Sequence, residues 1–368
     1  MHLRIILLLF LLLGPHAGAE VIPFYIGTMT DATTSKGIYL GSIDTGTGKL
    51  GPLTLAVEAK NPNFLALSPD HKFLFAALSN TVGSFQVRPD GSLKLLNEQP
   101  SGGGGFCHVG LDATGHHLFA ANYSGGNIAC FGVDPEGIIG KRTALMQFIG
   151  SGPNPSRQKK SYAHSVYIDP ENQFLYSCDL GSDSVWIFKF DALHGDLVST
   201  NPPAAKVPPG SGPRHLAFSP NGKFVYVINE MGVSVTAFAR DAARGALTTL
   251  ETVPALPPGT PTTGVTSAEI FCHPSGKWLY VSNRTSDTIS VFAIAPDGKL
   301  SLLQNTSSVA KFPRSFALDP SGHWLIAAGQ KDNRIAVLKI DPTTGKLTAT
   351  DQTAAVGGPV CVLFVPKK

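Results

Sequence analysis

Histidine, arginine and glutamate side chains interrupt the ends of short apolar segments in this sequence. His164 precedes SVYID, Arg214 precedes HLAFSP, and the runs FVYVIN and WLYVSN are followed by Glu230 and Arg284. Histidine or glutamate can act as a general base near neutral pH, and arginine can stabilise an oxyanion or bind a carboxylate or phosphate. Charged residues make up only 15% of the chain, and a buried charge needs a partner or a ligand. We therefore predict that these four side chains are the catalytic part of one site.

A second set of polar residues stands at corresponding points of other apolar segments. We predict that they contact substrate; they are His108, Asn122, Asp179, His215, Glu269, Arg314 and Gln330. Tyr123 and Asn283 stand at the same kind of position. For Asn122, Asp179 and Asn283 a second interpretation is open, because Asn and Asp at strand ends often hydrogen-bond their own backbone in turns.

The elements that must position these residues form an internal repeat. Each copy is a short apolar strand, a turn with Pro, Asp or Gly, and a second strand rich in Phe, Leu, Tyr and Val. The six copies are LALSPDHKFLFAAL from Leu65, VGLDATGHHLFAAN from Val109, VYIDPENQFLYSCD from Val166, LAFSPNGKFVYVIN from Leu216, IFCHPSGKWLYVSN from Ile270 and FALDPSGHWLIAAG from Phe316. Two further strand-like segments follow each copy, so the spacing of about 43 to 57 residues suits one four-stranded propeller blade per copy.

The two chain ends complete the count. The N-terminal part supplies FYIGTMT, GIYLGSI and LTLAVEA, and residues 359–366 supply one unpaired strand, PVCVLFVP. Joined, they make a seventh blade without open sheet edges. We predict an all-β, seven-bladed β-propeller with almost no helix; the alternative is an open array or two small sandwiches. Since strand direction alternates, the start of each first strand and the end of each second strand lie on one face, where the site should be.

Residues 1–19 are predicted to be a signal peptide, and residues 20–368 a single propeller domain. A basic start is followed by a nine-residue apolar run, too short to span a bilayer, and by Ala17-Gly18-Ala19. The alternative is a membrane anchor. We expect an exported protein, periplasmic or secreted, that is a monomer. A net charge of +3 without basic runs argues against nucleic acid or a membrane surface as partner. The five cysteines are predicted to be buried apolar residues, with neither a disulfide framework nor a zinc site.

Three segments resemble a known family. PRHLAFSPNGKFVYVINE, SAEIFCHPSGKWLYVSNR and HSVYIDPENQFLYSCDLG are similar to the seven-bladed β-propeller lactonases, which include 6-phosphogluconolactonases of the propeller type and carboxymuconate-cyclising enzymes. The resemblance covers the predicted mature chain. It implies a hydrolase for a sugar lactone or a related small anionic lactone, with His164, Arg214, Glu230 and Arg284 at the positions of the family's proposed active site. Which of His164 and Glu230 is the base stays open.

The resemblance leaves alternatives. We expect metal-independent hydrolysis without a cofactor; a calcium site built from Glu230, Asn283, Asp179 and Asn122 would suit oxygen ligands, but Arg214 and Arg284 would repel the ion. Because a propeller fold does not fix activity, a non-catalytic exported binding module is the competing class. A lactone-forming cyclase or isomerase is a third possibility.

Overall fold

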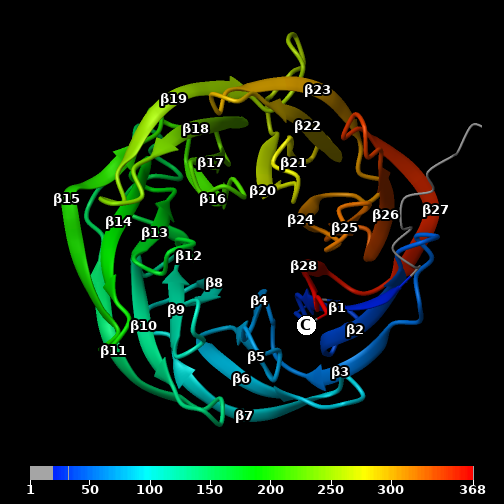
Figure 1. Ribbon diagram of the computed structural model, residues 1–368, viewed down its shortest axis with the longest axis horizontal. Coiled ribbons are helices and arrows are strands. Elements are labelled where there is room, and N and C mark those ends of the chain that lie inside the picture. The colour runs from blue at the N-terminus through cyan, green and yellow to red at the C-terminus, as the bar shows by residue number, and fades with distance from the viewer. Residues whose placement is uncertain (1–19, 32, 368) are drawn as a thin grey trace, which may run out of the picture.

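The chain forms a ring of seven four-stranded antiparallel sheets around a central axis (Figure 1). The computed structural model describes residues 20–31 and 33–367, and that part contains 28 strands and no α-helix. The predicted seven-bladed β-propeller is therefore confirmed. The predicted signal peptide lies outside the described residues. Within the described part, no helix has the length and apolar character needed to cross a membrane.

Each blade runs from an inner strand at the axis to an outer strand at the rim. The first blade consists of β28 (Pro359–Phe364), β1 (Val21–Thr28), β2 (Gly37–Asp44) and β3 (Thr54–Glu58). The second has β4 (Phe64–Leu67), β5 (Phe73–Ala77), β6 (Thr81–Val87) and β7 (Leu93–Pro100). The third has β8 (Phe106–Leu111), β9 (His117–Asn122), β10 (Asn127–Val133) and β11 (Ile139–Gln147). The fourth has β12 (Ala163–Ile168), β13 (Phe174–Asp179), β14 (Ser184–Asp191) and β15 (Asp196–Lys206).

The remaining three blades repeat the same order. The fifth has β16 (Pro213–Phe218), β17 (Phe224–Asn229), β18 (Ser234–Arg240) and β19 (Leu247–Pro254). The sixth has β20 (Thr266–Cys272), β21 (Trp278–Arg284), β22 (Thr288–Ile294) and β23 (Leu300–Ser307). The seventh has β24 (Pro313–Leu318), β25 (Trp324–Gly329), β26 (Arg334–Ile340) and β27 (Leu347–Ala355).

The first blade closes the ring with both ends of the chain. β28 pairs antiparallel with β1, with Tyr25 opposite Leu363 and Ile26 opposite Val362. The Ser35 hydroxyl donates a hydrogen bond of 2.6 Å to the Gly357 carbonyl from 322 residues away. The inner edge of β1 is therefore covered, as the sequence predicts.

Apolar packing between blades explains why the second strands are almost uniformly apolar. β9, β13 and β21 are buried at every position, because each is covered by a neighbouring blade on both faces of its sheet. Tyrosines on these strands also join blades: Tyr176 donates to the Gly245 carbonyl at 2.7 Å and Tyr280 to the Gly345 carbonyl at 2.7 Å. Both glycines have φ near +70°, a left-handed conformation that suits glycine in these turns.

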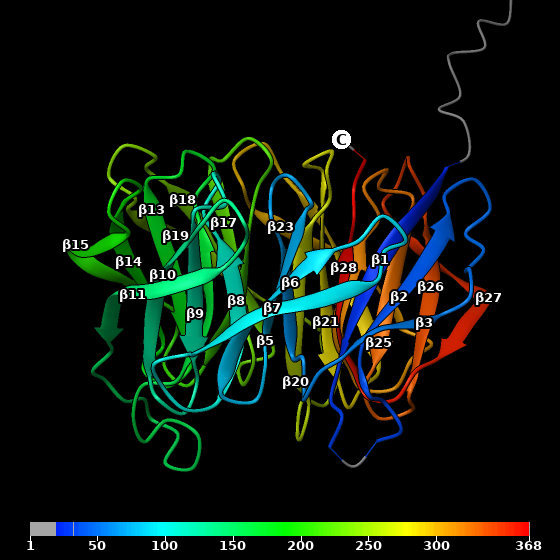
Figure 2. The same ribbon diagram turned by 90° about the horizontal axis from the view of Figure 1, so that it is seen from below.

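The two faces of the ring differ in which chain segments reach them. Viewed from the side (Figure 2), the connection between β11 and β12 hangs below the body, while the C-terminus lies on the upper face. The starts of the inner strands and the ends of the second strands lie on the lower face, where the sequence places the candidate site. All five cysteines are free thiols, four of them buried and Cys272 partly exposed, which agrees with the prediction.

Candidate active site

A cavity of about 480 Å³ opens at the axis on the lower face. We call it the charged pocket. Four predicted residues line it, namely His164, Glu230, Arg284 and Arg314, together with Tyr123, Arg157 and Phe312. These residues come from blades three to seven or the loops between them, so only closure of the ring brings them together.

Glu230 is the centre of the charged pocket. Its side chain is only 5% exposed, and it forms ion pairs with Arg157 at 2.6 Å, Arg284 at 2.9 Å and Arg214 at 3.4 Å. His164 Nε2 lies 4.0 Å from Glu230 Oε2. The structure therefore brings all four predicted catalytic residues into one contact group.

β-Bulges on the inner strands determine which side chains face the charged pocket. The pairing of β12, β16 and β24 with their second strands shifts register at the second residue, which is His164, Arg214 or Arg314. β8 has the same shift at Cys107. An extra residue in a bulge is left out of the ladder and its side chain is redirected. One residue per strand is thus turned to the lower opening of the channel.

The protonation states in this group follow from burial and charge. Burial alone would raise the pKa of Glu230, but the charges of Arg284 and Arg214 and the hydrogen bond from Arg157 hold it far below its usual 4.5. Burial and the nearby Arg214 lower the pKa of His164 well below 6.5. At neutral pH the site therefore presents an ionised glutamate beside a neutral imidazole.

Positive charge exceeds negative charge in the charged pocket. Three guanidinium groups line it, those of Arg157, Arg284 and Arg314, and the buried Arg214 contacts the single carboxylate, that of Glu230. Burial and the neighbouring guanidiniums lower the pKa of Arg314 to about 9, so it is mainly charged at pH 7. This surplus favours an anionic ligand or transition state.

Three predicted substrate contacts lie one layer deeper in the channel. His215 and Glu269 form a buried pair, with His215 Nδ1 2.7 Å from Glu269 Oε1. The ring of His108 stacks on Phe64, 4.0 Å away, and His108 and Glu269 line a different cavity. The reason is register: His108 and His215 are the residues after the bulge, and Glu269 is the fourth residue of β20.

The amide and carboxylate residues at second-strand ends bond within their own blades. The Asn122 amide donates to the Ser101 carbonyl and to Asn127. Asp179 accepts hydrogen bonds from the backbone of Tyr162 and Gly181. Asn283 accepts a hydrogen bond from Ser267 and donates to Ser290. Only Asp179 bonds the backbone of its own turn, at Gly181; Asn122 and Asn283 instead connect neighbouring strands and segments.

Gln330, the remaining predicted residue at a second-strand end, lies outside the charged pocket, and the described residues form no metal cluster there. The Gln330 backbone amide donates to the Phe312 carbonyl at 3.2 Å. Asn122, Asp179 and Asn283 do not converge with Glu230 into the oxygen set of the calcium alternative. Residues 20–31 and 33–367 contain no group of three or more His, Cys, Asp or Glu arranged to hold a metal ion.

The comparisons with known proteins agree with this architecture. The family model described as "Lactonase, 7-bladed beta-propeller" matches residues 23–364. The chain belongs to this family. A 6-phosphogluconolactonase of Formosa agariphila is 34% identical over 345 residues, covering 91% of this chain and 97% of the relative. One of Bacillus subtilis is 31% identical, covering 93% and 97%.

A solved structure adds a relative from outside the cytoplasm. The periplasmic gluconolactonase of Pseudomonas aeruginosa is 28% identical, with a TM-score of 0.88 over 94% of this chain and 99% of that one. The predicted resemblance and the lactone hydrolase class are thereby confirmed for this lactonase.

Three residues of the lactonase pocket were missed by the sequence analysis as site residues. Arg157 lies in the long connection between β11 and β12, where Asn154 Oδ1 accepts from the Arg157 amide and fixes a turn. Tyr123, noted at a strand exit, stacks on Tyr162 and lies 3.4 Å from Arg157. Phe312 has φ of 57° and places its ring 5.4 Å from the Arg284 guanidinium. Only Tyr123 stands at a repeated position; the other two lie in connections that no repeat describes.

Proposed function

We propose that this lactonase hydrolyses sugar lactones in the charged pocket, without a metal, using His164 as general base. The observation that carries the proposal is one ionised glutamate contacted by three arginines and a neutral histidine in a cavity of small-molecule size. Burying such a charged cluster costs folding stability, and a catalytic role would explain why it is present.

His164 suits the base role better than Glu230. A carboxylate whose pKa is strongly lowered by arginines is a weak base, whereas the neutral imidazole has a free lone pair. His164 Nδ1 has no hydrogen-bond partner among the described residues. When the imidazole takes a proton, the nearby Glu230 carboxylate stabilises the imidazolium. A well-placed base contributes about 10² to 10⁴ in rate.

The proposed reaction has two steps. Water attacks the lactone carbonyl carbon while His164 takes its proton, which leaves a tetrahedral oxyanion. Arg214 and Arg284 are suited to stabilise that oxyanion. Their buried Nε atoms have no hydrogen-bond partner among the described residues, although Arg214 Nε lies 3.4 Å from Glu230 Oε2. The ring C–O bond then breaks, and the imidazolium returns the proton to the ring oxygen, giving a hydroxy acid that ionises in water.

The surplus of arginines supports an anionic substrate. Arg314 and Arg157 are the two guanidiniums on the pocket wall that are not needed for the oxyanion, and arginine binds carboxylate or phosphate well. The two curated relatives are named for a phosphorylated lactone and the periplasmic relative for gluconolactone. A phosphorylated and a neutral aldonolactone are therefore the two substrates to compare.

The test is a panel of aldonolactones with and without a phosphate group, followed by acid release with a pH indicator after subtraction of spontaneous hydrolysis. We expect catalysed hydrolysis of at least one lactone of the panel. Glu230→Gln should reduce kcat/KM for that lactone about 10² to 10⁴-fold, because it removes the carboxylate that pairs with the arginines and stabilises the imidazolium of His164. Hydrolysis of none would favour the binding module. Full activity of Glu230→Gln would overturn the site assignment.

We also propose export of the chain through the predicted signal at residues 1–19. The support is the apolar run before Ala17-Gly18-Ala19 and the existence of a periplasmic relative. N-terminal sequencing of the protein recovered from the periplasm or the culture medium should give Glu20 as the first residue. Recovery of the uncleaved chain in the cytoplasm would contradict export.

A further inference from the structure

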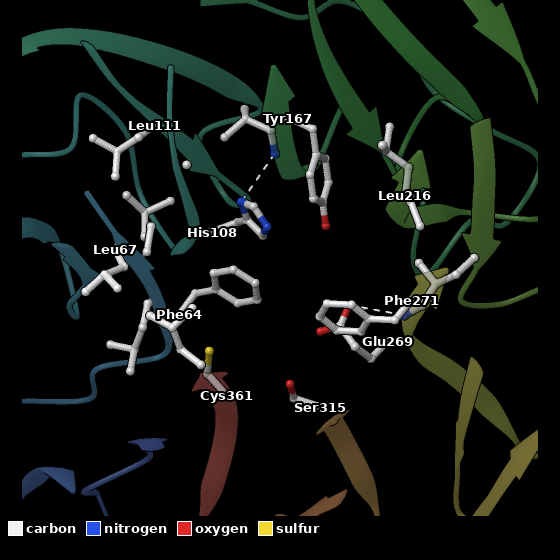
Figure 3. A pocket seen from close by; sticks show the side chains of 18 of the residues that line it. Phe64, Leu67, His108, Leu111, Tyr167, Leu216, Glu269, Phe271, Ser315 and Cys361 are labelled. Atoms are coloured by element: carbon white, nitrogen blue, oxygen red, sulfur yellow. Dashed lines mark hydrogen bonds between the residues drawn. The ribbon is translucent and has the colours of Figure 1, made fainter. Parts of the chain in front are cut away.

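A second cavity of about 500 Å³ lies on the axis at the opposite opening of the channel. We call it the apolar pocket. Inner strands of all seven blades contribute to it, and Figure 3 shows side chains from them facing a common space. His215, which lines neither pocket, lies between them: its ring is 5.3 Å from that of His164 in the charged pocket, and its Nδ1 is 2.7 Å from Glu269 in the apolar pocket. The apolar pocket is thus separate from the lactonase site.

Its walls are apolar and aromatic. Leu67, Leu111, Ile168 and Leu363 come from the far ends of inner strands, and Phe218 and Phe271 add rings. Deeper in, the rings of Phe64, His108 and Tyr167 follow one another, with centroids 4.0 and 4.8 Å apart. A flat aromatic ligand would find stacking surfaces on one side and aliphatic contacts on the other.

The floor of the apolar pocket carries a few polar groups. His108, Tyr167, Glu269 and Ser315 supply them, and Figure 3 shows the two hydroxyl oxygens directed into the space. Cavities of this volume with apolar walls and a few convergent polar groups are the usual form of small-molecule sites.

His108 provides an unused hydrogen-bond donor. The Val166 amide donates to His108 Nδ1 at 3.4 Å, so the neutral ring carries its proton on Nε2. That Nε2 is buried without a partner among the described residues, in a side chain only 2% exposed. Burial and the charge of His215 lower the pKa of His108 well below 6.5, which keeps the ring neutral.

Glu269 provides the matching acceptor. Its Oε1 contacts His215 Nδ1 and accepts a hydrogen bond from the Ile270 amide, and the neighbouring Ser315 hydroxyl also lowers the pKa of this carboxyl. The carboxyl and the unused donor on His108 face one ligand volume. A ligand group that both accepts and donates, such as a hydroxyl, satisfies both.

Charge at the floor excludes ionic head groups. No arginine or lysine lines the apolar pocket, so an anion would meet Glu269 without a facing cation. A cation would lack a full counter-charge, because burial raises the pKa of Glu269 to about 7 and leaves the carboxyl partly protonated at pH 7. A neutral head group avoids both penalties.

We propose that the apolar pocket is a second ligand site, which binds a small, neutral aromatic molecule bearing a hydroxyl group, with the ring between the apolar walls and the hydroxyl at the floor formed by His108, Glu269, Tyr167 and Ser315. The proposal does not rest on the lactonase function.

The first test is calorimetric titration of the purified protein with 4-propylphenol. We expect one saturable site with a Kd of about 10 µM to 1 mM, the range for roughly ten non-hydrogen atoms. 4-Propylanisole, 4-ethylbenzoate and 4-ethylbenzylammonium should bind at least about tenfold more weakly, since they lack the donor or carry a charge. Absence of saturable binding, or equal or tighter binding of either ion, would overturn the proposal.

The second test locates the bound phenol. Ile168→Trp fills the opening of the apolar pocket and should weaken binding about tenfold or more. The matched control Leu303→Trp, on the outer strand β23, should leave the Kd unchanged. Saturating gluconate should also leave it unchanged, because a product would occupy the charged pocket. If gluconate displaced 4-propylphenol, or if Ile168→Trp and Leu303→Trp bound it with the same Kd, the phenol would bind outside the apolar pocket and the assignment would be refuted.

Glu269→Gln separates the role of the floor from that of the walls. The side chain keeps its size but its terminal group becomes an amide, so we expect threefold to tenfold weaker binding of 4-propylphenol and little change for 4-propylanisole. An equal effect on both probes would show that the carboxyl does not contact the hydroxyl. Circular dichroism and thermal unfolding of each variant show that the propeller is intact.

Discussion

The two ends of the central channel belong to the same ring of blades, yet they have opposite character. The charged pocket presents three arginines and one carboxylate, whereas the apolar pocket presents leucines and aromatic rings above a small polar floor. The difference arises along single strands: on β12, His164 faces one pocket and Tyr167 the other. A propeller can thus keep two unlike cavities apart by a few residues along one inner strand.

Substitutions near the two ends of β12 test whether the two pockets are independent. His164→Ala removes the proposed base and should lower kcat/KM for the best lactone about 10² to 10⁴-fold. Tyr167→Phe, three residues further along, should change it less than about twofold. Steady-state kinetics of both variants is the measurement. Similar losses in the two would mean that the ends of the channel act as one site.

Arg284→Met should produce the next largest effect. The guanidinium contacts Glu230 at 2.9 Å and the Ser267 carbonyl at 3.1 Å, and it is a proposed oxyanion donor. Loss of such a donor costs about 10² to 10³ in kcat. Addition of free guanidinium should restore part of the rate if the charge is what matters. An unchanged kcat would leave Arg214 as the oxyanion donor.

The two buried carboxylates should respond to pH with opposite signs. Burial raises the pKa of Glu269 to about 7 from 4.5; its contribution to folding stability is therefore full below pH 4.5 and lost as pH rises to 7, by up to about 3 kcal/mol. The pKa of Glu230 is lowered, so its contribution is present above pH 4.5 and lost as pH falls.

Chemical denaturation between pH 3 and pH 7.5 measures the free energy of unfolding that tests this contrast. Relative to the unmodified protein, Glu269→Gln should gain stability as pH rises from 4.5 to 7. Glu230→Gln should instead lose stability, relative to the unmodified protein, as pH rises from 3 to 4.5. Parallel pH curves for the two variants would contradict the assigned protonation states.

Arg157→Met should give the smallest effect of the series. Arg157 is 40% exposed in its side chain and pairs with a carboxylate that has two other arginine partners. We expect KM for an anionic lactone to rise threefold to tenfold, with kcat within about twofold and a neutral lactone unaffected. A large fall in kcat would make Arg157 part of the reaction itself.

The sequence predicted the fold well because its periodic features repeat. Six similar hairpins and an unpaired C-terminal strand determine the number of blades, and each first strand must line the axis. The same logic predicted the contact group of His164, Arg214, Glu230 and Arg284.

The finer arrangement of the channel could not be predicted in the same way. A β-bulge shifts the register by one residue and decides whether Cys107 or His108 faces the charged pocket. The residue types at this position do not reveal the bulge. Arg157 is positioned by a turn in an irregular connection, where neither repeat nor alternation applies. Polar residues at first-strand starts therefore divide between two pockets that the sequence treats as one.

The pairing of β28 with β1 has a consequence for the order of folding. The innermost position of the first blade stays vacant until the last ten residues of the chain have been made, so the N-terminal sheet cannot finish early. Contacts at such large sequence separation slow folding. The first blade therefore stays a three-stranded sheet until β28 is available, and loss of this strand alone would leave six complete blades beside one exposed edge.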